Sequence, residues 1–195
     1  MKVPIELIRD LREKTGAGVT DCKEALAEAG GDMARAIELL RSKGLKIAAK
    51  KAGRLVTEGL VVSYIHGGGR IGVLLELNCE TDFVARTERF ASLAKDLAMQ
   101  VAASSPTYVD REEVLEKARQ GSGFMREGGL EKGSGQMEDE IEEFLSQACL
   151  MEQPFIKNPQ VTVGEVVKEA IAAFGENIVV RRFCRFQLGE GLTKS

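Results

Sequence analysis

Apolar residues recur at helical spacing in the N-terminal quarter of the chain, and short glycine-containing segments separate the repeats. Ile5, Ile8 and Leu11 lie three residues apart, as residues on one face of an α-helix do. The segment 15–18 interrupts this repeat, and two further repeats follow, the last ending at Gly44. The pattern predicts three short helices within residues 1–52, the last of which leads into a small basic linker at 46–53.

The rest of the chain mixes strand and helix patterns. Residues 60–65 and 70–78 are rich in aliphatic side chains and flank a turn with three consecutive glycines, which predicts a β-hairpin. A third strand is predicted at 178–188. Helices are predicted at 82–103, 111–120, 137–152 and 163–174, with a loop at 154–159 and a glycine-rich, mobile segment near 121–136. We therefore expect an α+β fold with a three-stranded antiparallel sheet.

The predicted strands carry apolar side chains on both faces. Simple alternation along the last strand places one row on one face, formed by Ile178, Val180, Cys184, Phe186 and Leu188, and places Val179 and Phe183 on the other. Such a sheet needs cover on both faces, and we expect helices on one and a second subunit on the other. Cys184 would then either pack under a helix of its own chain or approach its mate across a two-fold axis.

Composition and charge narrow the classes of protein. The chain has 195 residues, 44% of them hydrophobic, and a formal net charge of −3, which gives no electrostatic footprint for nucleic acid. The most basic stretch, at residues 46–54, is interpreted as a solvated face. Charge appears too early for a signal peptide, and no apolar run is long enough to cross a bilayer, so we expect a cytoplasmic protein without membrane contact. The four cysteines are scattered, which argues against a zinc site or a disulfide framework.

Motifs that carry chemistry are weak in this chain. Residues 67–72 match G-x-G-x-x-G, but a dinucleotide site needs a helix next, and here a strand is predicted. The single histidine, His66, excludes a two-histidine metal site, and no phosphate-binding loop of the G-x-x-x-x-G-K-[ST] type occurs. We therefore expect a binding protein without a chemical active site and without a cofactor.

The most informative segment is 78–86, where a predicted strand leads into a predicted helix. Thr81 is a good residue to cap that helix, and Asp82 would lie in its first turn, where the helix dipole favours negative charge. Phe83 is unusual, because a large aromatic residue at such a corner must either fold back into the core or insert into a partner.

The string Thr81-Asp82-Phe83-Val84 resembles an element of bacterial elongation factor Ts, the nucleotide exchange factor of elongation factor Tu. Residues 11–18, running into 21–26, and residues 175–183 resemble the same family. The resemblance implies an N-terminal three-helix bundle of the ubiquitin-associated type at 1–52, which docks on the partner. An α+β core domain would follow at 53–195, with its sheet covered by helices.

The resemblance also implies roles for individual residues. It assigns the disturbance of Mg²⁺ in elongation factor Tu to Thr81, Asp82, Phe83 and Val84. It assigns docking to the turn formed by Lys14, Thr15, Gly16, Ala17, Gly18, Val19, Thr20 and Asp21. Val19-Thr20 stands where many relatives carry methionines, which would reduce apolar contact. The short form of the family implies a homodimer, for which Val180, Cys184 and Phe186 are the candidate contact residues.

Two other functions would explain part of the sequence. A protein-interaction module of the ubiquitin-associated kind, without exchange activity, would explain the first 50 or so residues and leave the segment 81–84 without a role. An RNA-binding translation protein would need a basic patch or an aromatic platform, and the sequence offers neither.

Overall fold

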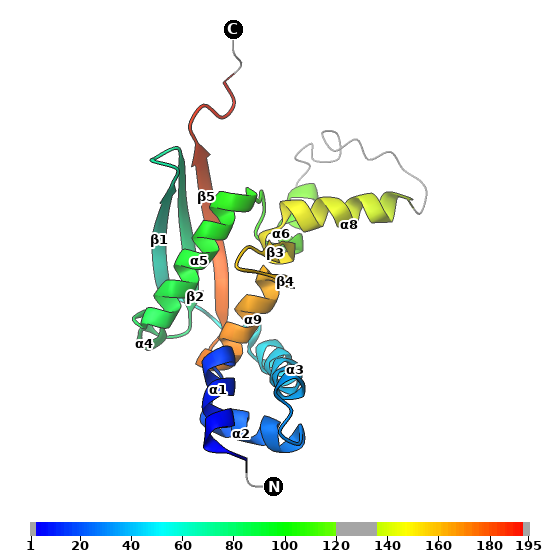
Figure 1. Cartoon of the computed structure of the whole chain (residues 1–195). Helices are drawn as coiled ribbons and strands as arrows, with labels where there is room; N and C mark the ends of the chain where they lie inside the picture. The colour runs from blue at the N-terminus through cyan, green and yellow to red at the C-terminus, as the bar shows by residue number, and fades with distance from the viewer. Residues whose placement is uncertain (1–2, 120–135, 193–195) are drawn as a thin grey trace.

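The computed structural model of the chain describes residues 3–119 and 136–192. The predicted mobile segment near 121–136 lies outside the described residues except for its last residue. Within the described ranges the chain forms eight α-helices and a three-stranded antiparallel sheet, which confirms the predicted α+β class. The N-terminal helices gather at one end of the sheet, as Figure 1 shows.

The N-terminal bundle consists of α1 (Ile5–Thr15), α2 (Val19–Glu28) and α3 (Met33–Lys51). Asp32 begins α3 as its N-cap, accepting a hydrogen bond from the backbone N–H of Arg35 at 2.9 Å. The helices enclose a small apolar core of their own, made by Leu11, Cys22, Ala25, Leu26, Ala29 and Ala36.

The prediction that the third helix ends at Gly44 is wrong. The helix continues to Lys51, so residues 46–51 are helical rather than a linker. Gly44 is buried where α3 crosses α9 (Val163–Phe174), and a Cβ atom added there would lie 3.3 Å from the Cβ of Ala172. Gly44 therefore permits the close approach of two helices, which outweighs its low helix propensity.

The sheet has the strand order β1 (Glu58–His66), β2 (Ile71–Cys79), β5 (Ile178–Gln187), and each neighbouring pair is antiparallel. The predicted hairpin turn at 66–69 is present, with three glycines at positive φ. A strand follows this turn, as predicted, so the glycine motif cannot hold a pyrophosphate at a helix N-terminus.

Two helices cover one face of the sheet. α5 (Glu88–Ser104) packs against all three strands, and α9 packs against β5 and α3 (Figure 1). The predicted single helix at 82–103 is in fact two, because α4 (Asp82–Ala85) ends after one turn and the hydroxyl of Thr87 caps α5 by accepting from Phe90 N–H at 3.2 Å. The main core lies between these helices and the inner face of the sheet.

The segment between α5 and α9 forms a second helical arm. α6 (Arg111–Arg119) and α8 (Gln136–Ala148) are followed by the 3₁₀ helix η1 (Leu150–Glu152) and by a small hairpin of β3 (Pro154–Phe155) and β4 (Asn158–Thr162). The predicted loop at 154–159 therefore contains paired strands. The buried amide of Gln100 ties this hairpin to α5 by donating to the Pro154 carbonyl at 3.2 Å.

A β-bulge in the last strand changes which of its residues lie on each face of the sheet, so the faces predicted from simple alternation are partly wrong. Leu77 pairs with Val180 and Glu76 pairs with Arg182, so Arg181 is an extra residue between them. The extra residue reverses the alternation, and Val180 is buried on the inner face while Cys184 and Phe186 are exposed on the outer face. The predicted apolar row is wrong at Ile178 and Val180, which lie on the inner face, and the predicted pairing of Val179 with Phe183 on one face is wrong as well. The alternative in which Cys184 packs under a helix of its own chain is also wrong, because Cys184 is exposed.

Candidate partner-binding surfaces

The corner between β2 and α5 presents one large apolar side chain to solvent. Phe83 lies on α4 and is 84% exposed, whereas its neighbours Val84 and Ala85 are buried in the main core. A helix of one turn can point only some of its residues inwards, and here those are Val84 and Ala85. The structure thus excludes the core position that the sequence left open for Phe83.

Thr81 does not cap α4 with its side chain, contrary to the sequence prediction. Its hydroxyl donates instead to one carboxylate oxygen of Glu176, at 2.5 Å. The other oxygen of Glu176 accepts the backbone N–H groups of Thr81, at 3.0 Å, and of Glu80, at 3.1 Å. The corner is therefore held by the loop between α9 and β5, which belongs to another of the three segments that carry the family resemblance.

A second set of contacts joins the same two loops, with the donor in the α9–β5 loop and the acceptor in the segment before α4. The carboxylate of Glu80 accepts the backbone N–H of Asn177 at 2.6 Å and pairs with the guanidinium of Arg54 at 3.3 Å. The backbone N–H of Asn177, with help from Arg54, holds the pKa of Glu80 below its usual range. The side-chain amide of Asn177 donates to the Arg54 carbonyl at 2.9 Å, which brings in the loop after α3.

Asp82 is half-exposed beside Phe83. It forms an ion pair with Arg86, one helical turn later, at 3.0 Å. Exposed pairs of this kind contribute little to stability, so the carboxylate can exchange this partner at low cost. Of the four residues assigned to the corner, Asp82 and Phe83 face outwards, Thr81 anchors the backbone and Val84 supports it from the core.

A second exposed feature is the turn between α1 and α2. Gly16 ends α1 in the left-handed conformation, with φ of 65°, and its carbonyl accepts from Arg89 of α5 at 3.4 Å. The hydroxyl of Thr15 donates to the Leu11 carbonyl at 2.7 Å. The turn is thus fixed from both sides, and Val19, 53% exposed, begins α2 on its outer surface.

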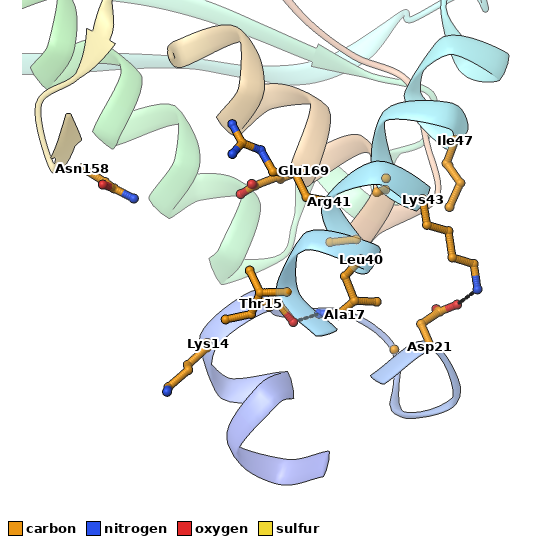
Figure 2. A pocket seen from close by; sticks show the side chains of 15 residues that line it. Lys14, Thr15, Ala17, Asp21, Leu40, Arg41, Lys43, Ile47, Asn158 and Glu169 are labelled. Atoms are coloured by element: carbon orange, nitrogen blue, oxygen red, sulfur yellow. Dashed lines mark hydrogen bonds and ion pairs between the residues drawn. The ribbon is translucent and has the colours of Figure 1, made fainter. Parts of the chain in front are cut away.

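A groove of about 230 Å³ lies beside this turn, and Figure 2 shows its lining from the bundle, α9 and the 158–162 strand. Asp21 and Lys43 face each other across one edge, 2.6 Å apart, and Asp21 followed by Glu24 raises the pKa of Lys43. Of the residues predicted to dock, the groove is lined by Lys14, Thr15, Ala17, Gly18 and Asp21. Gly16, Val19 and Thr20 do not line it.

The outer face of the sheet is the third exposed surface. No helix among the described residues covers it, and it carries an apolar group formed by Val61, Ile65, Leu74, Cys184 and Phe186. Glu76 lies on the same face between Arg181 at 3.5 Å and Arg182 at 2.7 Å. A large exposed apolar group rimmed by ion pairs is typical of a protein–protein contact.

Other kinds of site find little support in the part of the chain that the structure describes. No group of three or more His, Cys, Asp or Glu side chains there is arranged to hold a metal ion. Over the same residues, no helix has the length and apolar character to cross a bilayer. The described residues enclose three apolar cores, and the exposed apolar features on them are typical of a protein that binds other proteins.

Comparison with known proteins places this chain in a family. The model of the family described as Elongation factor TS matches residues 6–190. Elongation factor Ts of Carboxydothermus hydrogenoformans is 56% identical over 97% of this chain and 90% of the relative. The proteins of the same name from Desulforamulus reducens and Thermoanaerobacter sp. strain X514 are 54% and 50% identical, each over 99% of this chain and over 92% and 98% of the relative. The chain belongs to the elongation factor Ts family and thus to the elongation factors of protein biosynthesis.

Sequence reasoning missed the residues that hold these surfaces in place. Glu176, Arg54 and Arg89 were not identified as functional, because each acts through a contact with a distant segment. The only available signal was that Glu176 lies in a segment, 175–183, that resembles the family.

Proposed function

We propose that the chain is a guanine nucleotide exchange factor of translation elongation, acting in the cytoplasm. It binds elongation factor Tu with GDP, disturbs the Mg²⁺ and phosphate site and promotes replacement of GDP by GTP. Membership of the family supports the partner. The observation that carries the mechanism is the exposure of Phe83 on a corner fixed by three hydrogen bonds to Glu176.

The physical requirement is a difference in affinity. A GTPase holds its nucleotide through backbone N–H groups around the phosphates and through Mg²⁺. An exchange factor must bind the nucleotide-free state much more tightly than the filled state, and by linkage it weakens GDP by the same factor by which GDP weakens it. A rigid apolar side chain suits this task, because it fits only where the GTPase has opened.

The four residues of the corner have different roles in this mechanism. Phe83 inserts as an apolar wedge between elements of the GTPase domain. Asp82 leaves Arg86 and hydrogen-bonds or repels groups near the metal. Thr81 and Val84 keep the backbone in place, whereas the resemblance assigned all four residues to the disturbance of Mg²⁺.

The N-terminal bundle provides the surface that docks on the GTPase domain and anchors the chain there. The turn from Lys14 to Asp21 docks on the GTPase domain, with Val19 as its most exposed apolar side chain among these residues. Valine and threonine at 19 and 20 offer less apolar area than two methionines, so this anchor is weaker than in relatives that carry them.

The outer sheet face pairs with a second copy of the chain. Cys184 and Phe186 lie on this face and remain contact residues, whereas Val180 is buried on the opposite face. In a reducing cytoplasm the dimer rests on apolar burial and needs no disulfide.

Two dissociation constants test the proposal against a plain interaction module. We expect the chain to bind nucleotide-free elongation factor Tu at least about 100-fold more tightly than the GDP-loaded form, a difference of roughly 2.7 kcal/mol. Titration calorimetry with each form, at the same Mg²⁺ concentration, measures both values. Equal affinity for the two forms would support an interaction module without exchange activity.

A further inference from the structure

The carboxylate of Glu176 fixes the residues that lead from β2 into α4. Glu176 accepts three hydrogen bonds, from the hydroxyl and backbone N–H of Thr81 and from the backbone N–H of Glu80, at distances from 2.5 to 3.1 Å. Hydrogen bonds to an ionised acceptor are about twice as strong as those between neutral groups. These bonds fix the two residues that directly precede α4.

α4 depends on this support more than an ordinary helix does. It has only four residues, and its N-cap residue makes no side-chain hydrogen bond to the helix. Forming a single turn is unfavourable in isolation, because several dihedral angles are fixed for one hydrogen bond. Burial of Val84 and Ala85 secures one side of the turn, and Glu176 secures its start.

The loop that carries Glu176 is in turn fixed to the docking bundle. The ammonium group of Lys51, at the end of α3, donates to the carbonyl of Gly175. Arg54, three residues later, accepts from Asn177 through its carbonyl and pairs with Glu80 through its side chain. The α9–β5 loop therefore connects the end of the bundle with the corner.

We propose that Glu176 is a positioning residue for nucleotide exchange. It holds Phe83 at a fixed place relative to the docking bundle, so that docking delivers the ring to the GTPase in one orientation. This inference rests on the proposed function, because it assigns Glu176 a part in that same activity. In this role Glu176 acts through the residues that it holds rather than through a contact of its own with the partner.

The first test needs no partner. The chain contains no tryptophan, so Phe83→Trp introduces a single fluorescent reporter at the corner. Glu176→Gln keeps the shape of the side chain and removes its charge. We expect time-resolved anisotropy to show a larger fast local motion of the tryptophan in F83W/E176Q than in F83W. Thr81→Val, which removes only the hydroxyl donor, should give a smaller increase. Unchanged local motion in both variants would overturn the proposal.

The second test measures exchange in a double-mutant cycle. Release of fluorescent GDP from elongation factor Tu is followed at saturating factor for the wild-type chain, E176Q, F83A and F83A/E176Q. We expect E176Q to lower the maximal release rate about tenfold, the effect of one charge-assisted hydrogen bond. In the F83A background it should cause no further loss, because Glu176 acts through Phe83.

Control measurements separate the outcomes. Glu112→Gln makes the same change on the exposed first turn of α6 and should leave release unchanged. An equal loss from E176Q with and without Phe83 would show a general structural role and overturn the inference. If the wild-type chain itself releases no GDP, the proposed function fails, and the anisotropy test still decides whether Glu176 positions residue 83.

Discussion

At the scale of single residues, Phe83 is the side chain whose exposure most needs an explanation. A ring that is 84% exposed contributes almost nothing to the core, yet the turn that carries it is fixed on both sides. Burying an aromatic side chain of this size is a large favourable term at an interface. The proposed function accounts for this exposure, because insertion into the partner would bury the ring.

Phe83→Ala should slow catalysed GDP release without destabilising the fold. Because the ring is exposed, the free energy of unfolding should change by less than about 0.5 kcal/mol. Loss of a central aromatic anchor costs about 2 kcal/mol or more of interface energy, so release should slow about 30-fold. Stopped-flow release and thermal denaturation measure the two effects.

Leu115→Ala is the matched control for this variant. Leu115 is 55% exposed on α6, and Figure 1 shows α6 away from α4, so its truncation should affect neither release nor melting temperature. A loss of about 3 kcal/mol of stability in F83A, as for a core truncation, would contradict the assignment of Phe83 to the surface.

The sequence could identify Phe83 and could not identify what holds it. Local rules made Thr81 a helix cap, because threonine before a helix is usually one. The hydroxyl instead donates to Glu176, a residue 95 positions away in the sequence. A competition between a local acceptor and a distant one is decided by tertiary packing, which local patterns do not contain.

At the scale of elements, periodicity located most helices and strands, and packing decided where several of them end. α9 spans the predicted residues 163–174, where capping and apolar spacing agree. α3 passes Gly44, because the glycine lies against α9 and the helix gains contacts on both sides of it. The bulge at Arg181 left no signal in the alternation, so the faces of the last strand could not be predicted.

Gly44→Leu should destabilise the protein through this helix crossing. A Cβ atom at Gly44 already approaches Ala172 to 3.3 Å, so a larger side chain must push α3 away from α9. Overpacking of this kind costs about 1–3 kcal/mol, which lowers the melting temperature by roughly 2–4 °C per kcal/mol in a chain of this length.

Lys46→Leu provides the comparison, because it adds the same side chain to an exposed position of the same helix. Its melting temperature should stay close to that of the wild-type chain. A melting temperature of G44L equal to that of K46L would show that the contact between α3 and α9 accommodates a larger side chain, contrary to this account.

At the scale of the whole molecule, the three exposed surfaces differ in what they can bind. The turn at 14–21, which we propose docks on the partner, belongs to the bundle whose α3 is tied to the corner through the α9–β5 loop, and this connection suits contact with one rigid partner. The outer sheet face carries an apolar group with Phe186 70% exposed. The sequence predicted that one sheet face would need outside cover, and the bulge changed which residues lie on that face.

Phe186→Lys should convert the proposed dimer to a monomer. A charged side chain in the apolar group would be buried without a partner, which strongly disfavours association. Light scattering of the reduced protein at micromolar concentration should give twice 21.2 kDa for the wild-type chain and 21.2 kDa for F186K. Leu115→Lys, on the exposed surface of α6, should remain dimeric. A monomeric wild-type chain would contradict the sheet-to-sheet dimer.

The most direct test of the central claim is the release of fluorescent GDP from elongation factor Tu in the presence of this chain. The rate should rise with factor concentration and saturate, and it should fall when Mg²⁺ is raised, because the metal and the factor oppose each other at the nucleotide site. A release rate that does not change with factor concentration, although the two proteins bind, would contradict the claim that this chain is an exchange factor.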